Sequence, residues 1–297
     1  MSMRRSILAL ALLAAELFPV SAFGADADEF APVGDKEVVT LDPDASYVIL
    51  QTNSDSSMYS FGLTLLRRPT NADRSDYVRR RGEALAKAHA KWERQHASWT
   101  AEAGRWNAMK PNQRAGKRPV EPVEPTDANL AFLPIDRENM VQVGPFDRFA
   151  KKDGRSTFVH KVKPGRYVFY GPIIFNANAA GGTCMCMGSI EFEVPERTIV
   201  HAGMMTLNWM DERAKAKAEG RPVPKTDLDL PPEMNAVSWE LPRAGASIDP
   251  RLSAYRIVPA EMRAAGPFPN YFGVGIDRIT AIPGIITYDR DRIVAAN

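Results

Sequence analysis

The sequence has few of the residues, and none of the short motifs, that usually identify an enzyme or a zinc site. Its 297 residues include only two cysteines and four histidines. It contains no G-x-S-x-G, no H-E-x-x-H, no phosphate-binding loop and no paired C-x-x-C motif. These absences exclude a motif-based assignment to the common serine hydrolases, zinc peptidases, P-loop nucleotide hydrolases or zinc ribbons. We therefore expect a protein that is not an enzyme.

A hydrophobic run long enough to span a bilayer is also missing. The apolar run over residues 7–15 is too short for that role, and it follows a basic start and precedes a small-x-small sequence ending at Gly24. These features predict a signal peptide over residues 1–24, cleaved near Gly24-Ala25. No cysteine follows the run, so we expect no lipid anchor at the new N-terminus. The mature protein is predicted to be periplasmic or secreted, with no transmembrane segment.

The sequence does contain many short β-strand patterns. β-Branched and aromatic segments occupy residues 37–41, 46–52 and 60–68, and similar segments resume at Asn129, separated by Gly and Pro turns. This pattern predicts a mainly β protein. We expect an antiparallel β-sandwich, of immunoglobulin or transthyretin-like type, formed by residues 25–71 and 127–297 with an irregular C-terminal extension.

Two predicted hairpins carry a resemblance to a known group of proteins. They are Pro164-Gly165-x-Tyr167 and the segment from Phe192 to Gly203, in which Pro195-Glu196-Arg197 replaces the usual turn glycine. On these motifs the chain resembles uncharacterised exported β-domain proteins of bacterial envelopes over residues 37–68 and 129–207. The resemblance implies an envelope location and transfers no catalytic residues.

A different composition separates the two β regions. Residues 72–109 lack proline and are rich in Ala, Arg, Lys and Glu, which predicts one long helix. A row of apolar residues recurs every seven positions and so lies on one helical face, as in a coiled coil: Val78, Leu85, Trp92, Trp99 and Trp106. No second helix of matching length follows. The next run, KRPVEPVEPTD, has Pro119, Pro122 and Pro125 at every third position and predicts polyproline II.

The two repeats have similar physical lengths. Seven helical residues rise about 10.5 Å, and three polyproline II residues rise about 9.3 Å. We therefore predict an inserted arm over residues 72–126, in which the run folds back along the helix. In this arrangement the prolines contact the tryptophans in antiparallel order: Pro119 with Trp106, Pro122 with Trp99 and Pro125 with Trp92. Two alternatives stay open, namely a helix packed on the β-domain with the prolines as a loose linker, or neither arrangement.

Positive charge is concentrated in the same region. The whole chain is nearly balanced, with 38 basic and 36 acidic residues, but residues 79–118 contain eleven Lys and Arg against three Glu. We predict that the arm is a contact element for an envelope protein or an anionic surface, using Arg79, Arg80 and Arg81 together with the three tryptophans and three prolines. Nucleic acid is not an expected partner of an exported chain. The alternative is that these charges only solvate the helix.

Both cysteines lie in the segment GGTCMCMG, as Cys184 and Cys186. An oxidising compartment favours a disulfide, but strand residues two apart are separated by about 6.6 Å, so a bridge needs a local kink. Strand alternation would place both cysteines on the core face with Ile190 and Phe192. Inert buried thiols remain possible. A further alternative is a soft-metal site for copper, formed by Cys184, Cys186, Met185, Met187, His201 and Met204.

Overall fold

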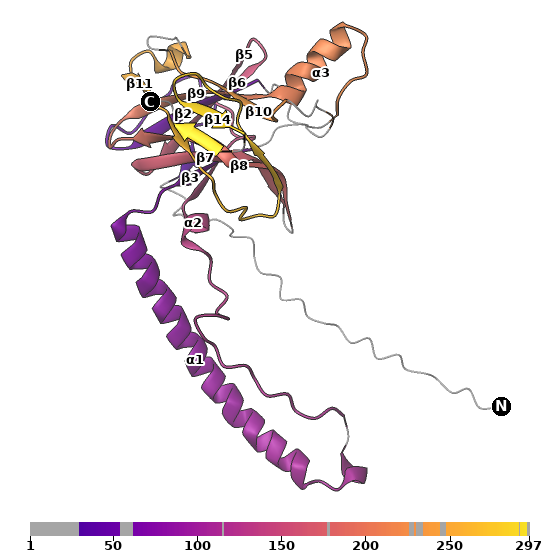
Figure 1. Cartoon of the computed structure of the whole chain (residues 1–297). Helices are drawn as coiled ribbons and strands as arrows, with labels where there is room; N and C mark the ends of the chain where they lie inside the picture. Colours follow the sequence, from indigo (N-terminus) through magenta and orange to yellow (C-terminus); the bar gives the residue numbers. More distant parts are fainter. Residues whose placement is uncertain are drawn as a thin grey trace, which may run out of the picture.

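The computed structural model describes residues 30–53, 62–114, 116–176, 179–225, 229, 234–243, 248–290 and 292–295. The predicted signal peptide lies outside these residues. The described chain is mainly β structure, with one long α-helix and two short ones (Figure 1). The helices are α1 (Asn71–Ala108), α2 (Ile135–Glu138) and α3 (Asn208–Ala218), with 3₁₀ turns at Pro111–Gln113 and Pro250–Leu252.

The strands form two large sheets and one hairpin. The first sheet has the strand order β1 (Ala31–Pro32), β6 (Arg155–Val162), β2 (Ser46–Thr52), β9 (Ile199–Leu207) and β10 (Val237–Glu240), with β5 (Ala150–Lys152) on β6 and β11 (Ile257–Pro259) on β9. The second has the order β12 (Arg263–Ala265), β8 (Ala179–Val194), β7 (Gly165–Asn176), β3 (Gly62–Arg67) and β4 (Met140–Val143), with β13 (Gly275–Arg278) on β8. The hairpin pairs β14 (Ile286–Asp289) with β15 (Arg292–Ala295).

Most of the strand pairs are antiparallel, as predicted, but three features of the predicted β-domain are wrong. The pairs β2–β9, β11–β9 and β13–β8 are parallel, because the chain passes through other strands between the members of each pair and no hairpin sets their direction. The predicted strands at residues 37–41 and from Asn129 are not formed, and the first strand after the arm is β4. The predicted hairpins at Pro164-Gly165 and at Pro195-Glu196-Arg197 instead join strands of different sheets. Turn residues report a tight change of direction but not whether the flanking strands pair.

Alternating apolar residues on the strands explain where the buried clusters lie. Val48, Leu50 and Phe158 of the first sheet meet Leu63 and Phe169 of the second in one large cluster. A second cluster covers the outer face of β7 and β8, and a third covers the outer face of β2 and β6. No residue of the arm belongs to any of these clusters among the described residues. Each fully buried aliphatic or aromatic side chain contributes roughly 1.5–3 kcal/mol, so the apolar part of the stability of the β-domain comes from residues outside the arm.

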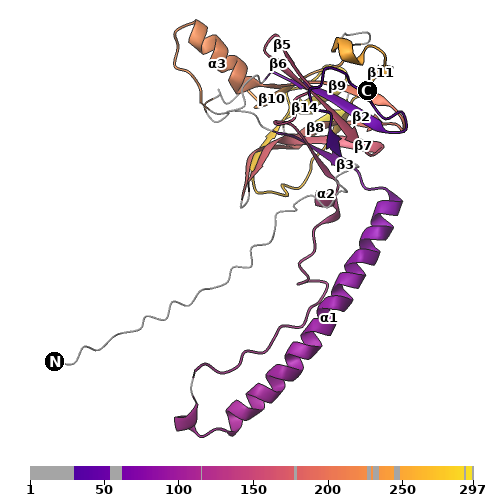
Figure 2. The ribbon, with the colours of Figure 1, turned by 180° about the vertical axis from the view of Figure 1, so that it is seen from behind.

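The arm projects from the β-domain. Helix α1 begins directly after β3 and points away from the sheets, and the chain then returns beside it, in both views of the molecule (Figures 1 and 2). Thr70 and Asp73 form a capping box at its start, in which each backbone N–H donates to the side chain of the other residue. With 38 residues the helix is roughly 57 Å long. The alternative of a helix packed on the sheet is not observed.

Candidate functional site

The returning chain, here called the folded-back segment (residues 117–127), runs antiparallel to α1. The indole N–H of Trp92 donates to the carbonyl of Pro122 at 3.0 Å, and that of Trp99 donates to the carbonyl of Pro119 at 3.3 Å. Seven helical residues therefore match three residues of the segment, as the two pitches predict. All three prolines are half-buried, whereas Val120 and Val123 are 87% and 81% exposed. The period of three thus keeps the prolines on the face toward the helix.

The register differs from the predicted one by one repeat. The predicted pairs were Trp99 with Pro122 and Trp92 with Pro125, whereas the hydrogen bonds join Trp99 to Pro119 and Trp92 to Pro122. The helical pitch fixes the spacing of the two rows but not their offset. The offset is instead set by polar partners that a pitch argument ignores. These are the indole N–H groups, the ion pair Arg81–Asp127 at 2.7 Å, and the close approaches of the His89 ring to Glu124 at 3.7 Å and of the His96 ring to Glu121 at 3.5 Å.

Two histidines complete the aromatic row of the helix. The ring of His96 lies 4.9 Å from that of Trp92 and 5.2 Å from that of Trp99, and the ring of His89 lies 5.8 Å from that of Trp92. The sequence signal for this row was the alternation of four and three residues through positions 85, 89, 92, 96, 99, 103 and 106. The seven-residue count alone selected Val78, Leu85 and the three tryptophans and included neither histidine.

Val78 does not continue the row, although the repeat of seven predicted that it would. Its side chain is 70% exposed, and Tyr77 occupies the inward position, where its ring lies 5.3 Å from that of Phe132. A straight α-helix drifts by about 20° per seven residues relative to a strict repeat. Over the four repeats between Trp106 and Val78 the drift reaches roughly 80°, which moves Val78 off the face.

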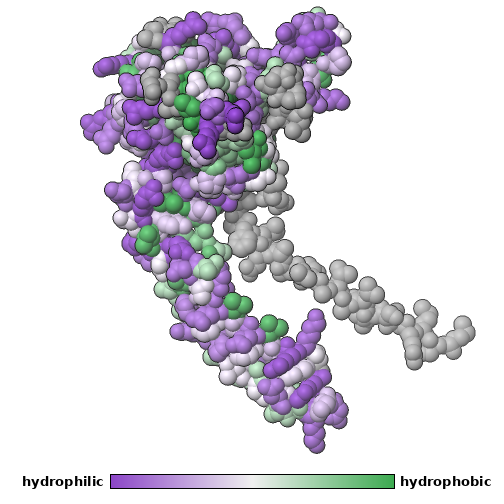
Figure 3. All heavy atoms as spheres, viewed as in Figure 1, coloured by the Kyte–Doolittle hydropathy of each residue, from purple (hydrophilic) through white to green (hydrophobic). Residues whose placement is uncertain are grey.

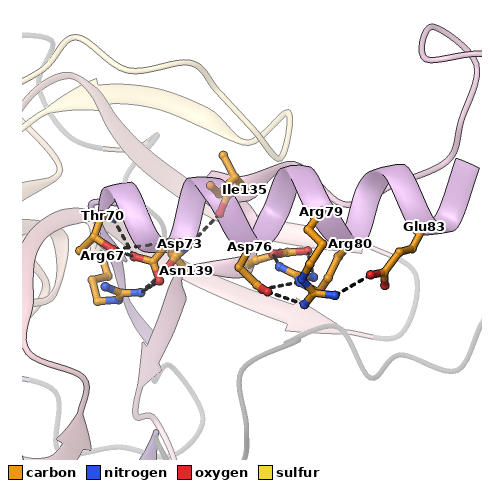
Figure 4. A network of polar contacts seen from close by, with 10 residues as sticks. Arg67, Thr70, Asp73, Asp76, Arg79, Arg80, Glu83, Ile135 and Asn139 are labelled. Carbon is orange, nitrogen blue, oxygen red and sulfur yellow. Dashed lines mark hydrogen bonds and ion pairs between the residues drawn. The ribbon is translucent and has the colours of Figure 1, made fainter.

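The root of the arm is held by a polar network (Figure 4). Arg67, at the end of β3, is only 5% exposed and donates to Asp73 and to Asn139, each at 2.7 Å. Burial opposes ionisation of Asp73, but hydrogen bonds from Arg67 and Thr70 outweigh it and lower the pKa of Asp73 to about 2. Asn139 also donates to the carbonyl of Ile135, in α2. The helix start is therefore fixed to the second sheet.

The three consecutive arginines predicted as contact residues are paired within the chain. Arg80 donates to both carboxylate oxygens of Glu138, at 2.6 and 3.1 Å, and also to Asp76. Arg79 bonds to Asp76 and Glu83 on its own helix, and Arg81 bonds to the carboxylate and the carbonyl of Asp127. Arg79, Arg80 and Arg81 therefore stabilise the arm root and the end of the folded-back segment.

The cations of the outer part of the arm differ from Arg79, Arg80 and Arg81 in their pairing. In the part of the chain that the structure describes, eight exposed cations beyond the root have no carboxylate within ion-pair distance: Lys87, Lys91, Arg94, Arg105, Lys110, Arg114, Lys117 and Arg118. Five of them lie in the arm tip (residues 103–118), whose sequence contains no Asp or Glu. Arg114 donates to the carbonyls of Met109 and Asn107. The arm surface visible in Figure 3 is mostly hydrophilic, with isolated apolar side chains.

The two cysteines form a disulfide, and the kink that it requires is present. Cys184 and Cys186 have Cα atoms 5.1 Å apart. Strand β8 carries extra residues at this point, since Val168 and Ile173 of β7 pair with Glu191 and Gly182. The bulge also reverses the predicted alternation. Both cysteines lie on the outer face beside Tyr170, while Ile190 and Phe192 lie in the cluster between the sheets.

The residues named for a copper site are not brought together. The two sulfur atoms of the cysteines are bonded to each other, Met185 lies between the sheets, and Met187 is partly exposed. His201 and Met204 line a separate cavity of about 220 Å³ on the first sheet. Burial lowers the pKa of His201 to about 4. Among the described residues no group of three His, Cys, Asp or Glu side chains could hold a metal ion.

Comparisons with models of protein families, with curated proteins and with solved structures found no significant match. Within the described ranges, no helix combines the length and the apolar composition needed to cross a bilayer. The geometry and charge of the arm are therefore the basis for a proposed function.

Proposed function

We propose that this is an exported, non-enzymatic protein of the bacterial envelope, in which a projecting arm contacts an anionic surface. The β-domain is proposed to be a sandwich of the immunoglobulin or transthyretin-like type that serves as the support. The support for a sandwich is the large cluster to which both sheets contribute side chains. The resemblance to exported β-domain proteins and the N-terminal signal pattern support export.

One observation carries the proposal: the arginine run at the root is neutralised by carboxylates, whereas all five tip cations have no carboxylate within ion-pair distance among the described residues. Arg79, Arg80 and Arg81 each bond to at least one carboxylate. The tip contains five basic residues and no acidic one. A cation near an anionic surface gains about 1 kcal/mol, and among the described residues no carboxylate lies within ion-pair distance of the tip cations. The cations thus lie at the end of the arm that lies farthest from the β-domain (Figure 1).

An extended anionic surface fits this arrangement better than a single acidic protein partner. The five tip cations come from the end of α1 and from the loop that follows it, and all are exposed. Long, hydrated Lys and Arg side chains spread over a projecting end can each find a separate negative group on an extended array. A compact acidic partner would satisfy only those cations that face it.

Retention on a sulfated polysaccharide matrix tests the proposal. In the tip variant all five cations become Gln: Arg105, Lys110, Arg114, Lys117 and Arg118. A control variant removes five exposed cations of the β-domain, which gives the same net charge: Lys36, Lys152, Arg155, Arg256 and Arg292. We expect the tip variant to elute at much lower salt and the control variant to elute close to the unaltered protein. Equal shifts for both variants would show that only net charge matters, and the arm would lose its proposed role.

A further inference from the structure

The arm tip combines its cations with an exposed apolar side chain. Met109 follows the last residue of α1 and is 41% exposed. Arg114 donates to its carbonyl at 3.1 Å, so the loop folds over the end of the helix and brings this guanidinium beside Met109. Lys110 is the next residue, and Arg105 lies in the last helical turn. Met109 is thus an apolar side chain surrounded by unpaired positive charge.

We infer that the tip binds anionic phospholipid bilayers end-on, with Met109 entering the headgroup region. This inference rests on the proposed function and names the surface as lipid. A soluble polyanion offers negative charge but no apolar layer behind it. Peripheral membrane segments combine the two features found here, namely cations for the headgroups and an apolar side chain for the layer beneath. Trp106, half-buried in the last helical turn, is of the type enriched at this interface.

The charges favour end-on rather than side-on binding. Val120 and Val123, on the outer side of the folded-back segment, are more exposed than Met109. They alternate with Glu121 and Glu124, whose carboxylates lie on the same exposed segment. An anionic bilayer would repel these glutamates. The tip has no such carboxylate, so it is the part of the arm that can approach the headgroups without repulsion.

Flotation of the mature protein with vesicles tests the binding. One set of vesicles contains phosphatidylcholine with about one third phosphatidylglycerol, and the other contains phosphatidylcholine alone. We expect binding to the anionic vesicles only, a loss of about 100-fold or more for the five-residue tip variant, and a loss of about tenfold for Met109→Asp. The five-residue control variant in the β-domain should bind within about threefold of the unaltered protein.

A solvent-sensitive nitrobenzoxadiazole label reports insertion directly. It is attached in turn to Met109→Cys, Val120→Cys and Val78→Cys, since both native cysteines are in the disulfide. With anionic vesicles we expect a blue shift and brighter emission for the label at 109 only. An equal response at 120 would overturn end-on docking. Binding without a response at 109 would overturn insertion and leave the proposed anionic-surface contact standing. Absence of vesicle binding, with retention on the polysaccharide matrix, would overturn lipid as the surface.

Discussion

The indole N–H of Trp92 donates to the carbonyl of Pro122, 30 residues further along the chain. The same bond recurs one repeat later, from Trp99 to Pro119. An extended proline-rich chain has no internal hydrogen bonds, so its carbonyls are free to accept these donors. The helix thereby orders the segment, and the segment covers the aromatic row of the helix. The arm is therefore one unit, in which an α-helix and an extended proline-rich segment share a repeat.

Removing these indole donors should loosen the arm. Trp92→Phe and Trp99→Phe keep an aromatic ring but lose the N–H, and each should destabilise the pairing by about 1 kcal/mol. We expect faster hydrogen exchange of the amides of residues 85–106 in the double variant, with unchanged exchange in the sheets. Trp106→Phe is the control, because the Trp106 indole makes no hydrogen bond to the segment among the described residues. Unchanged exchange in the double variant would mean that ring packing alone holds the segment.

The sequence predicted the repeat of this unit but not its offset. The spacing of Trp92 and Trp99 and of Pro119 and Pro122 follows from backbone geometry, which is the same in any helix or extended chain. The offset depends on side-chain pairs such as Arg81 with Asp127. Several nearby charged residues could form equivalent pairs at another offset, so the sequence does not select one of them. The tip was missed as a site for a related reason. The run Arg79 to Arg81 was predicted as a contact because cations are most dense there, but dense cations on a helix attract partners within the chain.

In the β-domain, too, local features could be predicted from the sequence and long-range pairing could not. Strand patterns located most strands, since alternation of apolar residues is a local property. Whether β6 pairs with β7 across Pro164-Gly165 is not local, because it depends on which sheet each strand joins. The bulge at Cys184 to Gly188 is likewise set by the neighbouring strands β7 and β13. Sequence periodicity therefore gave the wrong face for both cysteines.

The arm root should depend strongly on Arg67. In Arg67→Met the carboxylate of Asp73 and the amide of Asn139 lose a buried partner, which should cost roughly 3 kcal/mol of unfolding free energy. Arg79→Met is the matched control, because it breaks exposed pairs on the helix and should cost only about 0–1 kcal/mol. Urea denaturation measures both. Similar losses in the two variants would contradict the anchoring role of Arg67.

Stability should fall as the pH is lowered from about 6.5 to 4. Burial lowers the pKa of His160 and of His201 to about 4, against 6.5 for an ordinary histidine. In this window the unfolded chain binds protons that the folded chain does not, so the free energy of unfolding decreases with falling pH. Each histidine accounts for at most about 3 kcal/mol. Asp73 acts in a lower window, since its stabilising charge is lost only as the pH falls from about 4 toward 2.

Two measurements check this pH dependence. Urea denaturation at pH 7, 5.5 and 4.5 gives the slope, and NMR titration of the imidazole resonances gives the two pKa values in the folded protein. We expect both imidazoles to remain neutral at pH 5.5. The variant His160→Phe should flatten the slope by about half. A slope unchanged in this variant, or an imidazole that titrates near 6.5, would contradict the assignment.

The disulfide should contribute modestly to stability. It links residues two apart, so it closes a very short loop, and the chain-entropy account assigns about 1.5–2 kcal/mol to such a bridge. Cys184→Ala with Cys186→Ala should lower the free energy of unfolding by about this amount, and addition of a reductant to the unaltered protein should have a similar effect. Both are measured by urea denaturation. A fully unfolded double variant would show that the bulge in β8 cannot form without the bridge.

The β-domain should fold without the arm, because no residue of the arm lies in its three buried clusters. Deleting residues 72–126 removes Asp73, however, and leaves Arg67 as a buried cation with one fewer partner. The deletion should therefore be combined with Arg67→Met and closed by a short Gly-Ser linker. We expect near-UV circular dichroism and a cooperative urea transition like those of the full chain, together with loss of vesicle binding. Failure of this variant to fold would mean that the arm completes the β-domain. A folded variant that still floats with anionic vesicles would place the contact surface elsewhere.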